Sequence, residues 1–214
     1  MPVFLFALAL SPNINETRLL IVFVALHFFL YPASNGYNSY FDKDEESIGG
    51  LKNPPKVTPG LYYLALLFDA TALLLGAMIN WSFVLMLLIY GLVSKAYSHP
   101  SIRLKKYAWG SWFIAGLFQG AFTFLMVYTG LNDFPGSILW RQSILLPALL
   151  TSMILWGSYP MTQVYQHAED ARRGDNTLSI RLGILGTFHF TAAIFTIGVA
   201  LFCWYFIANY DISY

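Results

Sequence analysis

The chain has 214 residues, of which 57% are hydrophobic and 11% charged, and its formal net charge is +1. A soluble domain carries about 25% charged residues, so the composition excludes an ordinary soluble fold and offers no basic surface for nucleic acid. The single cysteine, Cys203, excludes a disulfide within the chain and is interpreted as a packing residue. The apolar runs are too many and too long for the core of a soluble domain of this size. We therefore predict an all-α fold, a polytopic transmembrane helical bundle.

Seven apolar runs follow one another along the chain. The first, residues 2–10, is too short to cross a bilayer, which takes about 20 residues, and we interpret it as an N-terminal helix fragment. Six full spans are predicted from the runs at residues 19–33, 60–78, 83–93, 107–128, 139–157 and 185–208. Asp69, near the middle of its span, is predicted either to lie buried against a neighbouring helix or to line a cavity. Gly116 and Gly120 have the spacing of close helix packing.

The first polar stretch, residues 35–46 (NGYNSYFDKDEE), follows an apolar run directly. Asn38, Asp42 and Glu46 recur every four residues, so on a helix one amide and two carboxyls share a face. Anions are costly beside hydrocarbon, and a divalent cation would offset that cost. Oxygen ligands of this kind suit Mg²⁺, which takes one or two carboxylates together with substrate phosphate. A solvated helix end flanking a membrane span is the alternative interpretation.

A second polar stretch, residues 163–175 (QVYQHAEDARRGD), also follows an apolar run. Gln163, Gln166, His167 and Asp170 have the spacing of one helical face. His167 is expected to be a hydrogen-bonding neighbour rather than a base. Two apolar helices that each end in an acid-bearing face predict a shared site at one membrane surface.

The numbers of Lys and Arg in successive loops are 3, 0, 4, 1, 3 and 0. By the positive-inside rule, this alternation places both polar stretches and the basic loop at residues 95–106 on the cytoplasmic side. The basic loop has the composition of a topology signal or a lipid-headgroup anchor, and its cations could also bind a diphosphate.

Acidic groups that could hold Mg²⁺, nearby cations and an apolar, aromatic-rich bundle suit a substrate with a diphosphate head and a long hydrocarbon tail. Mg²⁺ would bridge carboxylates and diphosphate oxygens and stabilise the leaving group, with help from Arg and Lys. Loss of diphosphate from an allylic carbon would leave a carbocation that aromatic faces can shield. An acceptor would then attack this cation.

These residues resemble the UbiA-type intramembrane prenyltransferases. The stretch from Asn38 to Glu46 is similar to the first motif of that family, NDxxDxxxD. Asn38 and Asp42 match it, Ser39 stands where the motif has Asp, and Glu46 replaces its last Asp. Asn35 fits an extended form of the same motif.

The second motif of that family, DxxxD with a TLxxRLG tail, resembles residues 166–183. Asp170 matches the closing Asp, whereas Gln166 stands at the position of the opening one. Residues 97–105 are similar to the basic loop that lies between the two motifs in the family. The order and spacing of the three elements agree, and the resemblance covers nearly the whole chain.

The resemblance implies a Mg²⁺-dependent integral-membrane prenyltransferase of the inner cell membrane. Such an enzyme moves a polyprenyl group from an allylic polyprenyl diphosphate to an aromatic or other lipid-precursor acceptor, as in quinone biosynthesis. The implied catalytic residues are Asp42 and Asp170, and the implied Mg²⁺ ligands are Asp42, Glu46 and Asp170. The implied diphosphate-binding residues are Asn35, Asn38, Arg103, Lys105, Gln163, Gln166 and Arg172.

The expected organisation is one transmembrane helical domain over residues 1–214, lacking part of the first helix and the last two of the nine helices usual in the family. Two other functions stay open. Ser39 and Gln166 remove two motif charges, which leaves room for a non-catalytic isoprenoid- or lipid-binding relative. Hydropathy and Asp69 alone would also fit a small membrane transporter, although two acidic helix ends at one surface argue against a transporter.

Overall fold

The computed structural model describes residues 1–43 and 55–210. Glu46, the expected last residue of the first motif, lies outside the described residues. Internal contacts divide the chain into two compact units. The first unit comprises Met1–Lys105 and Met126–Gly136, and the second comprises Lys106–Leu125 and Ser137–Tyr214. Each unit is described by itself below, and the expected single domain over the whole chain stays a prediction.

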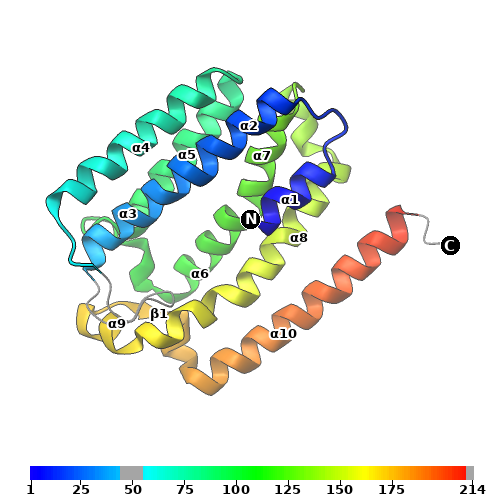
Figure 1. The fold of residues 1–214 in the computed structure, drawn as a ribbon. Coiled ribbons are helices and arrows are strands. Elements are labelled where there is room, and N and C mark those ends of the chain that lie inside the picture. Colours follow the sequence, from blue (N-terminus) through cyan, green and yellow to red (C-terminus); the bar gives the residue numbers. More distant parts are fainter. Residues whose placement is uncertain (44–54, 211–214) are drawn as a thin grey trace. The chain divides into compact units, whose positions relative to one another are not determined.

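Within the described residues, six helical stretches are long and apolar enough to cross a membrane: Glu16–Asp42, Pro59–Ala77, Trp81–Ser98, Ala108–Leu131, Gln142–Arg173 and Leu178–Asn209. Each of the six predicted spans overlaps one of them, so the all-α membrane fold is confirmed (Figure 1). A short helix, α1 (Pro2–Ala9), lies where the N-terminal helix fragment was predicted.

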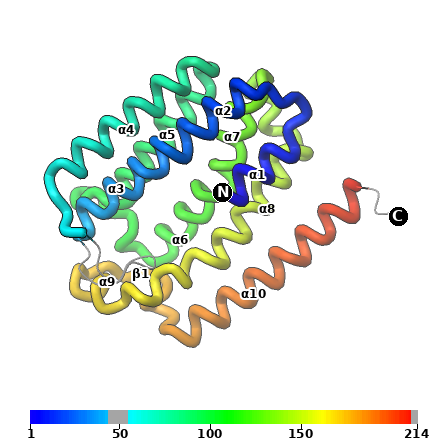
Figure 2. The backbone as a smooth tube through the Cα atoms, viewed as in Figure 1, coloured from blue at the N-terminus to red at the C-terminus, as the bar shows by residue number. Residues whose placement is uncertain are grey.

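The first unit contains α1, one long helix, a helical hairpin and the part of α7 (Thr123–Leu131) from Met126 onward. In the long helix, α2 (Glu16–Val24), the π-helical turn η1 (Ala25–Leu30) and α3 (Tyr31–Asp42) follow one another without a break, as the smooth tube in Figure 2 shows. The hairpin consists of α4 (Pro59–Ala77) and α5 (Trp81–Ser98), and the short η2 (Leu104–Lys106) follows it.

Polar side chains cap the starts of two helices in this unit. Asn15 accepts a hydrogen bond from the backbone N–H of Arg18 at 3.0 Å. Asn80 accepts one from Phe83 at 2.8 Å. Each cap satisfies a backbone donor that has no partner within its helix. The two caps explain why α2 and α5 begin where they do.

Asp69, in the middle of α4, forms an ion pair with Lys95 of α5. The Lys95 ammonium also lies 5.3 Å from the centre of the Tyr37 ring on α3. Gly91 lies beside the pair, and a Cβ at this position would lie 3.5 Å from Asp69 Oδ1, an ordinary van der Waals contact. Asp69 is therefore partly buried and paired with a neighbouring helix, which agrees with the first of the two predicted alternatives. Lys95, assigned to the basic loop from the sequence, belongs to the last turn of α5 and reaches inward.

The second unit contains the remaining spans. Its elements are α6 (Ala108–Leu117), the π-helical turn η3 (Phe118–Phe122), the start of α7 (Thr123–Leu131), most of η4 (Gly136–Trp140), α8 (Gln142–Ser158), η5 (Tyr159–Gln166), α9 (His167–Arg173), β1 (Asn176–Thr177) and α10 (Leu178–Asn209). The helices α6, α8 and α10 pack against one another and carry the polar segment between α8 and α10 at one end.

Gly116 in α6 and Gly120 in η3 let these two elements approach α8 closely, as the spacing of the two glycines predicted. A Cβ on Gly116 would lie 2.0 Å from the Trp156 ring, and one on Gly120 would lie 2.5 Å from the backbone of Ser152. The hydroxyl of Ser152 accepts from the Ala121 N–H at 2.9 Å and donates to the Gly116 carbonyl at 3.0 Å. These bonds satisfy backbone groups beside the π-helical turn.

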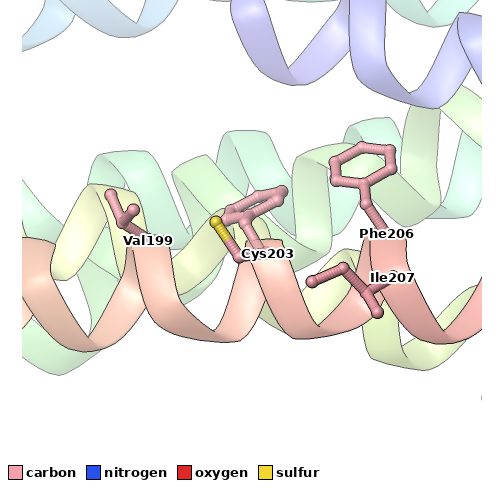
Figure 3. A pocket seen from close by; sticks show the side chains of 5 residues that line it. Val199, Cys203, Phe206 and Ile207 are labelled. Carbon is pink, nitrogen blue, oxygen red and sulfur yellow. The ribbon is translucent and has the colours of Figure 1, made fainter. Parts of the chain in front are cut away.

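The outer half of α10 lines an apolar hollow of about 390 Å³ (Figure 3). Its lining residues are Val199, Phe202, Cys203, Phe206 and Ile207. Cys203 is exposed there, so its interpretation as a packed core residue was wrong. At 1.5 Å per residue, Val199 is about 30 Å along α10 from its first residue. The hollow is thus far from the polar segment and suits hydrocarbon rather than the chemistry of acids and cations.

Candidate active site

Three side chains on one face of α3 are paired with α5 and the loop that follows it. Ser34 pairs with Ser94, and Asn38 with Ser98, each sixty residues later in the chain. Asp42 pairs with Lys105, sixty-three residues later. The numbers rise together along both partners, so α3 and α5 run in the same direction. The four-residue spacing of the first motif therefore produces the shared face that it predicted.

The pair between Asp42 and Lys105 is almost entirely buried. The two side chains are 6% and 7% exposed. Removing two charges from water costs several kcal/mol per ion unless they are paired. The attraction between the two groups offsets part of this cost, because each side chain has the other as a close partner. A predicted metal ligand and a predicted diphosphate-binding residue are thus direct neighbours.

A tight turn after α5 brings Lys105 back to the end of α3. The backbone N–H groups of Ile102 and Arg103 both bond to the His99 carbonyl, at 3.0 and 2.8 Å. Arg103 has a left-handed backbone with φ of 47°, a conformation that is uncommon outside glycine. Pro100 disfavours the helical conformation at His99, which ends α5 there. The basic loop is therefore an ordered turn.

The remaining predicted residues of the first unit are less enclosed. Arg103 and Ser39 are partly buried, whereas Asn35 is exposed. Asn38 accepts a hydrogen bond from the Ser98 hydroxyl at 2.5 Å, and Ser98 is only 1% exposed. The structure thus brings Asn38 into the row of paired residues and leaves Asn35 outside it.

The second unit holds three buried carboxylates close together in sequence. Glu169, Asp170 and Asp175 are 7%, 5% and 3% exposed. The guanidinium of Arg173 lies 3.8 Å from Glu169 and 3.4 Å from Asp170. Arg172 lies 3.9 Å from Glu169, but its side chain is 64% exposed. Arg173 is therefore the more enclosed cation, although only Arg172 was predicted from the sequence.

The expected helical face from Gln163 to Asp170 is not a continuous α-helical face, and this prediction was wrong. Residues 159–166 form a 3₁₀ helix, and Gln166, with φ of −100° and ψ of 4°, separates it from α9. The cause is Pro160, which has no N–H to donate to the Trp156 carbonyl. That carbonyl accepts instead from the Trp112 indole N–H at 2.8 Å.

This local geometry places the predicted polar residues at different depths. Gln163 is 6% exposed, and its Oε1 has no hydrogen-bond partner within the described part of the chain. Gln166 and His167 are partly buried. The Nε2 of His167 hydrogen-bonds the hydroxyl of Ser179 at 2.6 Å. His167 is therefore a hydrogen-bonding neighbour, as predicted.

The residues after α9 form a compact connection to α10. Gly174 ends α9 in the left-handed conformation, with φ of 75°, which favours glycine. The Asp175 N–H returns to the Asp170 carbonyl at 2.9 Å. Thr177 caps α10 by accepting from the Ile180 N–H at 3.4 Å. Gly183, with φ of 68°, kinks α10 near its start. The last part of this segment begins the next helix, α10.

Fold and site together define a polytopic helical membrane protein that buries carboxylates beside cations at the ends of apolar helices. The model of the UbiA prenyltransferase family matches residues 1–214. The chain belongs to this family, which confirms the resemblance and its classification as a prenyltransferase. No match is found among curated proteins.

Solved structures of a UbiA homolog from Archaeoglobus fulgidus have a similar fold. The structure with GPP and Mg²⁺ has 18% sequence identity and a TM-score of 0.71, over 98% of this chain and 75% of that one. The structure with DMAPP and Mg²⁺ has 17% identity, the same TM-score and the same coverage. A third, with Cd²⁺, has 18% identity, a TM-score of 0.68 and again the same coverage.

Proposed function

We propose that the protein transfers a polyprenyl group from an allylic polyprenyl diphosphate to a hydrophobic acceptor and requires Mg²⁺. The observation that carries this proposal is the buried pair of Asp42 and Lys105. It joins an oxygen ligand suited to Mg²⁺ with a cation suited to a diphosphate, at the end of an apolar helix. The A. fulgidus homolog with GPP and Mg²⁺ supports the same substrate class.

The carboxylates present fit Mg²⁺. This ion is usually held by one or two carboxylates and substrate phosphates, with water, rather than by a complete protein cage. In the described residues, no three His, Cys, Asp or Glu side chains are arranged to hold a metal ion, so we propose that the substrate completes the site. When bound, Mg²⁺ would neutralise charge developing on the leaving diphosphate.

The chain's own residues then have separate roles. Asp42 and Asp170 bind the metal–diphosphate complex, and Glu46 is the proposed further ligand. Lys105 donates to diphosphate oxygens and stabilises the charge that grows on them as the allylic C–O bond breaks. The proposed neighbouring contacts to diphosphate come from Asn35, Asn38, Arg103, Gln163, Gln166 and Arg172.

Two motif positions lack the expected charge, and buried acids nearby favour catalysis over a purely lipid-binding role. Gln166 brings no negative charge, but Glu169 and Asp175 are buried in the same unit as Asp170. The guanidinium of Arg173 is paired with two of these carboxylates, Glu169 and Asp170. The second motif therefore retains negative charge through residues outside its usual spacing.

An aromatic cluster in the second unit suits a carbocation. The rings of Trp112 and Trp156 are 5.7 Å apart, and Phe190 lies 5.6 Å from Trp112. The faces of such rings attract cations. We propose that this cluster shields the allylic cation after diphosphate leaves, so that the acceptor rather than water captures it.

We also propose that both motifs face the cytoplasm, in the inner membrane of a cell, and that the acceptor is a lipid precursor such as those of quinone synthesis. Because Lys95 belongs to α5, the number of Lys and Arg residues counted in the basic loop falls from 4 to 3. The alternation between loops persists, so the positive-inside argument is unchanged.

The test is diphosphate release by membranes that carry the full chain, supplied with geranylgeranyl diphosphate, with and without Mg²⁺, against a panel of acceptors. Release that requires both Mg²⁺ and one acceptor supports the proposal and identifies the acceptor class. Mg²⁺-dependent binding of the donor without release, across the panel, would instead favour a lipid-binding relative.

A further inference from the structure

Within the described residues, the side-chain amide of Asn38 is held through its oxygen. The hydroxyl of Ser98 donates to Asn38 Oδ1 at 2.5 Å. An amide carbonyl accepts hydrogen bonds, whereas its NH₂ group can only donate them. A serine hydroxyl can donate or accept a hydrogen bond. In this structure it donates to Oδ1, so the oxygen of the Asn38 amide faces α5 and its two N–H donors point elsewhere.

Ser98 is well placed to impose this orientation. It is 1% exposed and belongs to the last turn of α5, a rigid element, while Asn38 lies in the first motif, four residues before Asp42. The hydroxyl thus acts on a motif residue without belonging to a motif itself. Nothing in the local sequence around Asn38 indicates this contact, because its partner is sixty residues away.

We propose that Ser98 is a positioning residue for prenyl transfer, and that it makes Asn38 present its N–H donors to the diphosphate. This inference rests on the proposed function. N–H groups donate to anionic phosphate oxygens in strong, charge-assisted hydrogen bonds, whereas Mg²⁺ binds oxygen atoms. Asn38 therefore binds the diphosphate itself, and metal binding is left to carboxylates such as Asp42.

The same two helices provide a matched control. Ser34 and Ser94 form an equivalent hydroxyl pair one turn earlier on both helices. Neither residue belongs to a motif. Ser94→Ala therefore removes a hydrogen bond between the same helices without touching Asn38, and it measures what such a bond contributes to helix packing alone.

The experiment measures the affinity of the full chain in lipid nanodiscs for a non-reactive geranylgeranyl thiolodiphosphate, with Mg²⁺ present. Ser98→Ala is expected to weaken binding about 5- to 10-fold, the equivalent of one hydrogen bond. Ser98→Thr keeps the hydroxyl, and Ser94→Ala leaves the bond between Ser98 and Asn38 in place. The affinity of each is expected to stay within about twofold of the wild-type affinity. Thermal unfolding midpoints verify that each variant is folded.

Two further variants separate positioning from packing. In an Asn38→Ala background, Ser98→Ala is expected to have no further effect on affinity, because the amide that it positions is gone. Asn38→Asp keeps an acceptor for Ser98 but replaces the N–H donors with a negative oxygen. It is expected to weaken binding more than Ser98→Ala does, and added Mg²⁺ should not restore it.

Several results would overturn the inference. Equal losses in Ser94→Ala and Ser98→Ala would assign Ser98 to packing, as would a loss from Ser98→Ala that persists without Asn38. Unchanged affinity in Ser98→Ala, or wild-type affinity in Asn38→Asp, would show that the amide donors do not meet the diphosphate. If the wild type fails to bind the analogue with Mg²⁺, the proposed function itself fails, a result distinct from those above.

Discussion

The carboxylate of Asp42 and the ammonium of Lys105 form an ion pair that is almost completely withdrawn from solvent. The two residues belong to the first motif and to the basic loop, which are far apart in sequence. In the absence of substrate, each therefore compensates the charge of the other. In the proposed function, a metal–diphosphate complex would bring a cation for Asp42 and an anion for Lys105, and each charge would then exchange one partner of opposite charge for another.

Asp42→Asn and Asp170→Asn are each expected to abolish Mg²⁺-dependent turnover. Each loses a charged ligand at a partly desolvated site, where the attraction is worth several kcal/mol, or about a thousandfold in rate. Diphosphate release in membranes, normalised to the amount of folded protein, measures the effect. Turnover near the wild-type level in both variants would contradict the metal assignment.

Lys105→Met is expected to lower stability, because it leaves the Asp42 carboxylate buried without its partner. Breaking a buried pair from one side typically costs about 3–5 kcal/mol. The double variant Asp42→Asn with Lys105→Met removes both charges and should unfold at a higher temperature than Lys105→Met alone. Thermal unfolding in detergent compares the wild type, the two single variants and the double variant, and additive losses in the double variant would disprove the coupling.

Asp69 and Lys95 are expected to support the fold rather than the reaction. Asp69→Asn leaves the inward-pointing Lys95 uncompensated inside a span and should destabilise the protein by about 3 kcal/mol. Asp69→Leu combined with Lys95→Met should recover most of this loss. The folded double variant is expected to bind the prenyl donor with wild-type affinity. A specific loss of donor or acceptor binding in the stable double variant would instead place the pair in the substrate site.

Gly120→Ala is expected to be more damaging than Gly110→Ala. A methyl group on Gly120 would lie 2.5 Å from the Ser152 backbone, whereas one on Gly110 would lie 3.6 Å from Tyr107 Cβ. Overpacking of this kind costs about 1–3 kcal/mol, in addition to any strain at the π-helical turn. Unfolding temperatures provide the comparison, and equal midpoints for the two variants would mean that α8 moves aside freely.

The spans and the first motif could be predicted from the sequence because both depend on local rules. Membrane helices need a minimum apolar length, and the four-residue spacing of Asn38 and Asp42 survives because α3 is a regular helix. The same reasoning failed between Gln163 and Asp170, where Pro160 converts the chain to a 3₁₀ helix and the periodicity changes.

The partners of the motif residues could not be predicted in the same way. Ser98 and Lys105 meet α3 through packing of helices distant in sequence, and no local pattern encodes such contacts. Arg173 was also not predicted from the sequence, but for a different reason. Its spacing of three and four residues from Asp170 and Glu169 is a local signal for ion pairs along a helix, and this spacing would have identified it.

The parallel row of pairs between α3 and α5 makes the first motif sensitive to rotational phase. One residue inserted into α3 between Ser34 and Asn38 would turn everything beyond it by about 100°. Ser34 would keep its partner, while Asn38 and Asp42 would swing away from Ser98 and Lys105 together. The paired residues of the long helix must therefore keep one rotational register. We expect the helix to tolerate point substitutions far more readily than a change in its length.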